Sequence, residues 1–216
     1  MTIPTSTPPS WAQVETLLGP LPRRAVTAFA VRAARRIAPV IAHTGEHYGP
    51  ESLEWMNAIE ATMRIVEAYC AGESVSRFTL DLASDVARCA ANAMANASQM
   101  LGPSAHAEAA ELAYAAAAFA ADCARAKNPT RATTLAVQAV RAAANGNEIT
   151  PEQQADLRTL YAQTLGDPNW PTDATEDGPM GSLWPNGEPT WFTTGKEQFH
   201  KAKLAVVVLA ISKPVL

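Results

Sequence analysis

Residues 104–127 read SAHAEAAELAYAAAAFAADCARAK, and this stretch decides the fold class. Thirteen of its 24 residues are alanine, and Leu112, Tyr114 and Phe119 are its only bulky apolar side chains. Alanine is the best helix former and a poor strand former. Because small side chains on every side of a helix let neighbouring backbones come close, we expect this helix to lie near the centre of a helical bundle.

Helical patterns continue on both sides of this stretch, and 26 of the 44 alanines in the 216 residues fall between positions 83 and 144. Apolar spacing, capping residues and Gly-Pro breaks predict helices at residues 11–18, 23–42, 51–71, 79–101, 104–127, 130–144 and 151–165. Ser10 and Thr150 are the expected N-caps of the first and last of these, and Pro39 is expected to kink or end the second. The sequence therefore predicts an all-α, alanine-rich bundle of six to eight helices within residues 1–165, with a flexible N-terminus at residues 1–9.

Residues 166–195, named the strap below, break this pattern. They are rich in Pro and Gly, contain three of the five tryptophans and have no Lys or Arg. A long irregular stretch in a compact domain is functional or disordered, and the tryptophans favour order because each buries a large apolar area on docking. We predict an irregular acidic strap packed on the bundle. An apolar element, helix or strand, is expected to follow at residues 196–216, with a capping-box pattern at Thr194 marking its start.

The composition argues against several functional classes. Seventeen basic against 21 acidic residues give a net charge of −4, which has the wrong sign for a general nucleic-acid binder. No apolar run has the roughly 18 residues of a membrane span, and the Pro/Thr/Ser-rich N-terminus lacks the regions of a signal peptide. The three cysteines lie among apolar positions and are expected to be reduced and buried. We therefore expect a cytoplasmic protein.

Two oppositely charged segments lie far apart in the chain. Every charged residue between positions 16 and 45 is an arginine, whereas every charged residue between positions 159 and 195 is an aspartate or a glutamate. Either the strap docks on the arginine face within the chain, or one or both segments contact a partner protein, because Arg and Trp are frequent at interface hot spots. We favour docking through the tryptophans, with the strap carboxylates left exposed for a basic partner. The candidate partner-binding residues are Arg24, Arg32, Arg35, Arg36, Asp173, Glu176, Asp177, Trp184 and Trp191.

A metal site is an alternative interpretation of residues 43–47. His43, Glu46 and His47 match the H-x-x-E-H pattern of one class of zinc peptidases. That chemistry needs both histidines on one helix face, whereas Gly45 inside the motif and the Gly-Pro pair at 49–50 indicate a turn. We therefore expect no metal or cofactor, and keep this cluster only as a candidate.

The motifs of common enzyme classes are missing from the sequence. It contains no G-x-S-x-G, no Walker loop and no G-x-G-x-x-G, so we expect no catalytic residues. A further alternative is a protein that binds a small apolar ligand or a lipid between its helices. The side chains expected beside such a ligand are Trp55, Met56, Met63 and Phe119.

Several segments together resemble a known family. They are FAVRAARRIAP at residues 29–39, AIEA at residues 58–61, Ala-Gly at residues 71–72 and the alanine-rich run that begins at Ala83. Over about residues 25–97 the chain resembles the alanine-rich, all-α immunity proteins of bacterial polymorphic toxin systems. The resemblance implies a small cytoplasmic protein that binds and neutralises a toxin without catalysis. The leading expectation is therefore a non-enzymatic protein-interaction module that neutralises or regulates its partner.

Overall fold

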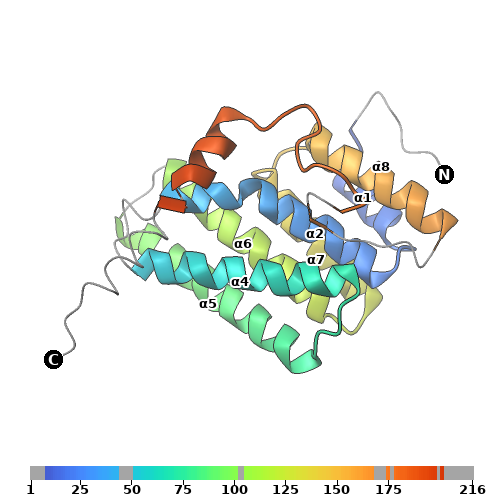
Figure 1. The fold of residues 1–216 in the computed structure, drawn as a ribbon, viewed down its shortest axis with the longest axis horizontal. Helices are drawn as coiled ribbons and strands as arrows, with labels where there is room; N and C mark the ends of the chain where they lie inside the picture. The colour runs from blue at the N-terminus through green and yellow to red at the C-terminus, as the bar shows by residue number, and fades with distance from the viewer. Residues whose placement is uncertain are drawn as a thin grey trace.

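The computed structural model of the chain describes residues 8–43, 51–101, 105–167, 174–175, 178–198 and 200–201. Within these residues the regular structure is helical and no strand is present, which confirms the predicted all-α class. Figure 1 shows the helices packed side by side, with the strap lying across one face of the bundle. No helix in these ranges combines the length and the hydrophobicity that are needed to cross a membrane.

The elements follow the predicted order. They are α1 (Trp11–Leu18), α2 (Arg23–Ile37), the 3₁₀ helix η1 (Ala38–His43), α4 (Glu51–Ala71), α5 (Arg77–Leu101), α6 (Ala105–Arg125), α7 (Pro129–Ala143) and α8 (Pro151–Gly166). Residues 190–198 form a further helix. Apart from the predicted 23–42 helix, each predicted bundle helix begins and ends within two residues of the observed one.

The alanine-rich helix α6 lies at the centre of the bundle, as its composition predicts. It packs against α2, α4, α5 and α7 (Figure 1). Three consecutive alanines, Ala116, Ala117 and Ala118, are buried. Because successive helical side chains point about 100° apart, their burial means that neighbours cover most of the circumference of α6.

A second central helix, α2, is buried along most of its length. Every residue from Ala25 to Ala34 is buried, Arg32 included. The helix contacts α4, α6, α7 and α8, and the strap covers the side that carries Arg32 and Arg36. Arg32 and Arg36 therefore lie in the interior, because α8 and the strap bring polar groups to them.

The predicted helix ends are confirmed where the capping chemistry is strong. Ser10 and Thr150 each form a capping box with the glutamine three residues later. The α-helix α2 ends at Ile37, two residues before Pro39, and continues as η1. This agrees with the expected end at the proline, which removes a backbone donor and clashes with a preceding carbonyl.

The predicted start of the C-terminal element at Thr194 is wrong. Thr194 lies inside a helix that begins at residue 190. The carbonyl of Pro189 accepts the backbone N–H groups of Phe192 and Thr193 at 2.9 and 3.2 Å, and these bonds start the helix earlier than the capping pattern suggested. The apolar residues 204–211 lie outside the described residues.

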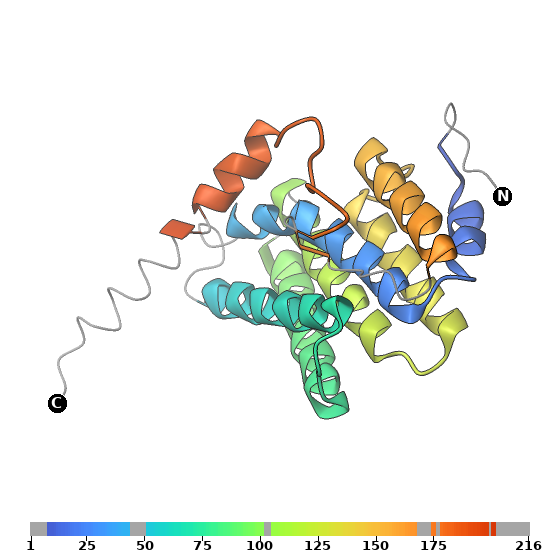
Figure 2. The same ribbon diagram turned by 45° about the vertical axis from the view of Figure 1, so that its right-hand side comes forward.

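The 190–198 helix passes close to η1 (Figures 1 and 2). A Cβ added to Gly195 would lie 2.7 Å from both the Cβ and the carbonyl oxygen of Pro39. Since real Cβ atoms do not approach that closely, only glycine fits this crossing without a shift of one backbone. Gly195 therefore fixes how near the end of the strap lies to the bundle.

Candidate functional site

Two buried arginines of α2 share one carboxylate of α8. Arg32 is 0% exposed, Arg36 3% and Asp156 4%. Asp156 Oδ2 accepts hydrogen bonds from Arg36 Nη1 at 2.7 Å and from Arg32 Nε at 3.1 Å, and Oδ1 lies 3.1 Å from Arg32 Nη2. Two cations and one anion in an apolar interior need further acceptors to offset the loss of water.

Backbone carbonyls of the strap supply these acceptors. Arg32 donates to four of them: Gly181 at 2.9 Å, Ser182 at 3.0 Å, and Ala174 and Thr175 at 3.4 Å each. Arg36 Nε donates to the carbonyl of Leu183 at 2.9 Å. Hydrogen bonds from a charged donor are stronger than neutral ones, so the two arginines fasten the strap to α2.

The aromatic residues of the strap pack around the same junction. The guanidinium carbon of Arg36 lies 5.9 Å from the ring centroid of Trp184. Trp184 makes edge-to-face contacts with Trp191 and Phe192, with ring centroids 5.8 and 5.3 Å apart. The strap therefore docks within the chain through tryptophan and arginine together, which is the first of the two interpretations left open above.

This docking decides which predicted partner-binding residues a partner can reach. Arg32 and Arg36 are buried and are not available to one in this conformation. Arg24 is exposed, with its guanidinium carbon 5.6 Å from the ring centroid of Tyr69. Trp191 is 44% exposed.

The acidic part of the predicted partner surface falls elsewhere. Asp173, Glu176 and Asp177 lie outside the described residues, so their exposure to a basic partner stays a prediction. Of the predicted residues that the structure describes, Arg32 and Arg36 lie inside the molecule, whereas Arg24 and Trp191 are exposed.

A cleft of about 570 Å³ lies beside the junction and is bounded by α2 and η1, by α4, and by the strap with the 190–198 helix. Its lining residues are Arg35, Ala38, Pro39, Ile41, Met56, Ile59, Glu60, Met63, Glu67, Ala174, Thr175, Leu183, Phe192, Lys196 and His200. Of the residues predicted to contact an apolar ligand, Met56 and Met63 line it, whereas Trp55 and Phe119 do not.

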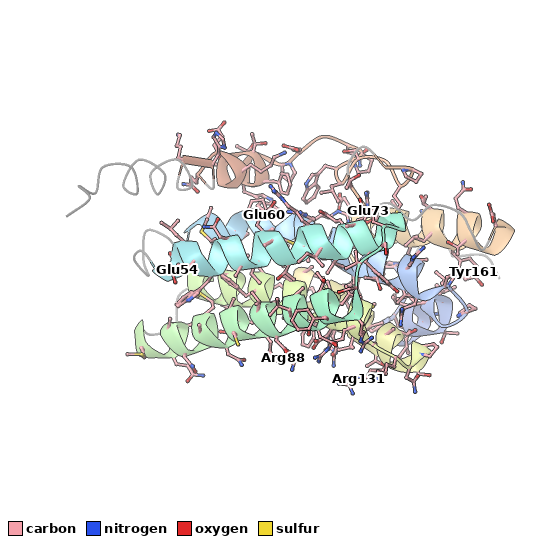
Figure 3. All side chains as sticks on the ribbon, turned by 60° about the horizontal axis from the view of Figure 1, so that its bottom comes forward. Glu54, Glu60, Glu73, Arg88, Arg131 and Tyr161 are labelled. Atoms are coloured by element: carbon pink, nitrogen blue, oxygen red, sulfur yellow. The ribbon has the colours of Figure 1, made fainter. Side chains whose placement is uncertain are left out.

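Arg35 forms a closed ion-pair cluster in the wall of this cleft. Its Nε and Nη2 donate to Glu67 at 2.6 and 2.7 Å, and its Nη1 donates to Glu60 at 2.5 Å. Burial by itself would lower the pKa of Arg35, but the bonds and charges of Glu67 and Glu60 outweigh it and raise that pKa. Figure 3 shows Glu60 on the side of α4 that faces the strap.

The candidate metal cluster is only partly within the described residues. His43 ends η1, whereas Glu46 and His47 lie outside them. Among the residues that the structure does describe, no three His, Cys, Asp or Glu side chains lie close enough together to hold a metal ion. The hypothesis of a metal site at residues 43–47 stays untested.

The cysteines differ from the expectation in one case. Cys70 and Cys123 are buried, as predicted, but Cys89 is exposed on α5. Burial raises the pKa of the Cys123 thiol to about 12, against a smaller lowering effect of its hydrogen bond with Thr27. Cys123 is therefore a neutral core residue at physiological pH, whereas Cys89 is open to solvent.

No family model, curated protein or solved structure matches this chain. The resemblance to immunity proteins therefore rests on the sequence segments alone, and it stays a prediction.

Sequence reasoning missed an apolar stripe on the outer face of α5. Phe78, Leu82 and Val86 are 76%, 53% and 36% exposed, and Cys89 continues their line one turn further along. The i, i+4, i+8 spacing was readable in the sequence, but the predicted helix began at residue 79 and so omitted Phe78. The inward face of the same helix is also apolar, with Leu80, Ala83, Ala87, Ala90 and Met94 buried.

Ion pairs border this stripe. Arg77 pairs with Asp81 within α5 at 3.3 Å. Two further pairs join α5 to α6: Arg88 of α5 with Asp122 at 2.7 Å, and Asp85 of α5 with Arg125 at 3.3 Å. The hydrogen bond and charge of Asp122 raise the pKa of Arg88. Figure 3 shows Arg88 on the side of the molecule away from the strap. The stripe is also separate from the cleft, because no residue of α5 lines the cleft.

Proposed function

We propose that the chain is a non-enzymatic protein-interaction module and that the α5 stripe is its docking surface. The observation that carries the proposal is the exposure of Phe78, Leu82 and Val86 in one line on one helix. Exposed apolar side chains occur singly on most proteins, but contiguous patches of them mark interaction sites. Among the described residues, Met100 and Trp191 are the other exposed large apolar side chains, and neither belongs to this line.

The surroundings of the stripe support protein binding over other uses. Protein interfaces combine an apolar centre with a charged rim. Here Phe78 and Leu82 supply large apolar side chains, and the pairs Arg77–Asp81 and Arg125–Asp85 supply a rim of both signs. A rim of mixed sign matches a protein surface better than it matches a polyanion.

The sequence resemblance suggests what kind of partner this is. An immunity protein of a toxin system acts by binding its toxin in the cytoplasm, and we extend that role to this chain. The proposal that the chain is not an enzyme rests on the absence of nucleophile and phosphate-binding motifs from its sequence. The partner is then a protein that presents an apolar face, such as one side of an amphipathic helix.

The test is a binding experiment with a paired substitution. The wild-type chain is immobilised, proteins that bind from an extract of its source organism are identified, and each is purified for titration. The double variant Phe78→Ser/Leu82→Ser is expected to lose the partner while its melting temperature changes little, because both side chains are mostly exposed. Size-exclusion chromatography with light scattering then gives the stoichiometry of the purified complex.

Met100→Ser is the matched control. Met100 is 86% exposed on the same helix, but it lies 22 residues from Phe78, roughly 33 Å along the axis. Binding should survive this change. A partner that binds the double variant as tightly as the wild type contradicts the proposal. If the wild type and Met100→Ser self-associate and the double variant does not, the stripe is instead a contact between copies of the chain.

A further inference from the structure

The cleft beside the strap has the features of a site for an elongated small molecule, independent of the α5 stripe. Its volume of about 570 Å³ lies within the range of roughly 300–1,000 Å³ that is usual for ligand pockets. We propose that it binds a long-chain carboxylate. The alkyl chain would lie along α4, and the carboxylate would lie beside Lys196 and His200.

The wall on α4 favours a long apolar group. Met56, Ile59 and Met63 follow one another at helical spacing, and Glu67 closes the row one turn later. Met56 and Glu67 are 11 positions apart, which corresponds to roughly 16 Å along the helix axis. Ile41, Leu183 and Phe192 line the opposite walls. Methionine side chains adapt to the shape of what they contact, so this wall fits a flexible chain.

At one end of the cleft the carboxylates are already paired with arginines. Glu67 is bound by two nitrogens of Arg35, and Glu60 is bound by Arg35 and by Arg64 Nε at 2.9 Å. These charges satisfy one another within the protein. A cationic head group would therefore have to compete with guanidinium groups already in place, which argues against an amine as the ligand.

The other end carries basic groups. Phe192, Lys196 and His200 recur at intervals of four along the terminal helical segment and all three line the cleft. Lys196 Nζ donates to Glu188 Oε1 at 2.8 Å, and an ammonium group has three N–H donors, so a second acceptor can bind beside Glu188. His200 is exposed and adds a further donor. The cleft thus has hydrogen-bond donors at one end and apolar side chains along the rest of its walls. This arrangement matches a ligand with an anionic head group on an alkyl chain.

Calorimetric titration with sodium dodecanoate, dodecanol and dodecylamine tests the proposed ligand. The three probes share a twelve-carbon alkyl group and differ in the charge of the head group. All three probes are used below the concentrations at which they aggregate. Dodecanoate is expected to bind one site per chain, at least about tenfold more tightly than either of the others. No binding of dodecanoate, or equal affinity for dodecylamine, overturns the proposal.

Two variants of the terminal helix test the head-group position. Lys196→Met/His200→Ala should reduce dodecanoate affinity about tenfold and leave dodecanol affinity unchanged. Lys201→Met is the matched control, because Lys201 is exposed on the same segment but does not line the cleft. All these side chains are exposed or half-exposed, so a melting curve for each variant is expected to match the wild type. Equal dodecanoate affinity in the double variant and the wild type refutes the assigned head-group position.

The methionine methyl groups report where the chain binds. In ¹³C-methyl NMR spectra, dodecanoate should shift the signals of Met56 and Met63, whereas that of Met100, on the outer end of α5, should stay in place. A shift confined to Met100 would mean adsorption on α5 and would overturn the assignment. Binding to phosphatidylglycerol vesicles without binding of monomeric dodecanoate would also overturn it, because the ligand would then be a membrane surface.

Discussion

Replacing Asp156 by Asn tests the buried junction between α2, α8 and the strap. The substitution keeps the shape of the side chain but removes the negative charge of Asp156 that pairs with both Arg32 and Arg36, which are 0% and 3% exposed. Both guanidinium groups then remain in the interior without the carboxylate that they share. The amide would also present N–H groups to other donors.

The expected cost follows from the burial and the number of pairs lost. Removing one partner of a buried ion pair costs about 3–5 kcal/mol, and here one change breaks two pairs, at 3.1 and 2.7 Å. We therefore expect the free energy of unfolding to fall by about 5 kcal/mol. A chain of this size loses roughly 2–4 °C in melting temperature per kcal/mol, so the expected drop is about 10–20 °C.

Urea unfolding at low and high salt measures this loss, and Asp85→Asn is the control. Asp85 is 62% exposed and pairs with Arg125 at 3.3 Å, so its loss should cost about 1 kcal/mol or less and should shrink in 1 M NaCl. The Asp156→Asn loss should be insensitive to salt. Adding Arg36→Met should recover part of the lost stability, because it removes one of the two uncompensated charges. A loss below about 1 kcal/mol, or one that salt abolishes, would refute this account of the junction.

Three further outcomes are expected. Gly195→Ala should push the 190–198 helix away from Pro39, lower the free energy of unfolding by about 1–3 kcal/mol and speed amide exchange in that helix; unchanged exchange would contradict the close crossing. Ellman's reagent should modify one thiol in the native chain, that of Cys89, and all three only after unfolding. Because burial raises the pKa of Cys123 to about 12, the stability that its neutral thiol contributes is complete below the unfolded pKa near 9 and declines above it by about 1.4 kcal/mol per pH unit. The difference in free energy of unfolding between wild type and Cys123→Ala, measured from pH 8 to 10.5, should be constant up to about pH 9 and follow this slope above it.

The helices were predictable where local chemistry determines them. Gly-Pro breaks, the capping boxes at Ser10 and Thr150, and the alanine content of residues 104–127 act within a few positions of one another, so the sequence displays them directly. The central position of α6 follows from the small size of its side chains. The full burial of Arg32 could not be read from a local pattern, because a charged side chain normally indicates a solvent-facing position.

The surfaces that carry the functional proposals were harder to predict. The acceptors of Arg32 come from residues 124–150 positions later in the chain, and no local pattern announces such contacts. The cleft depends on how the strap lies over α4, which the spacing of Met56 and Met63 indicates only in part. The α5 stripe was visible as a second apolar face, but its exposure depends on the absence of a covering helix along that side of α5 in the described residues.

The long-range hydrogen bonds of Arg32 affect how the chain folds while it is being synthesised. On the ribosome, α2 is complete when fewer than 40 residues have been joined, whereas Asp156 and the strap carbonyls follow more than 110 residues later. Until they emerge, the nascent bundle carries two arginines that cannot leave water without a large penalty. The central helix must therefore stay hydrated on one side throughout most of synthesis, and final compaction waits for the last fifth of the chain.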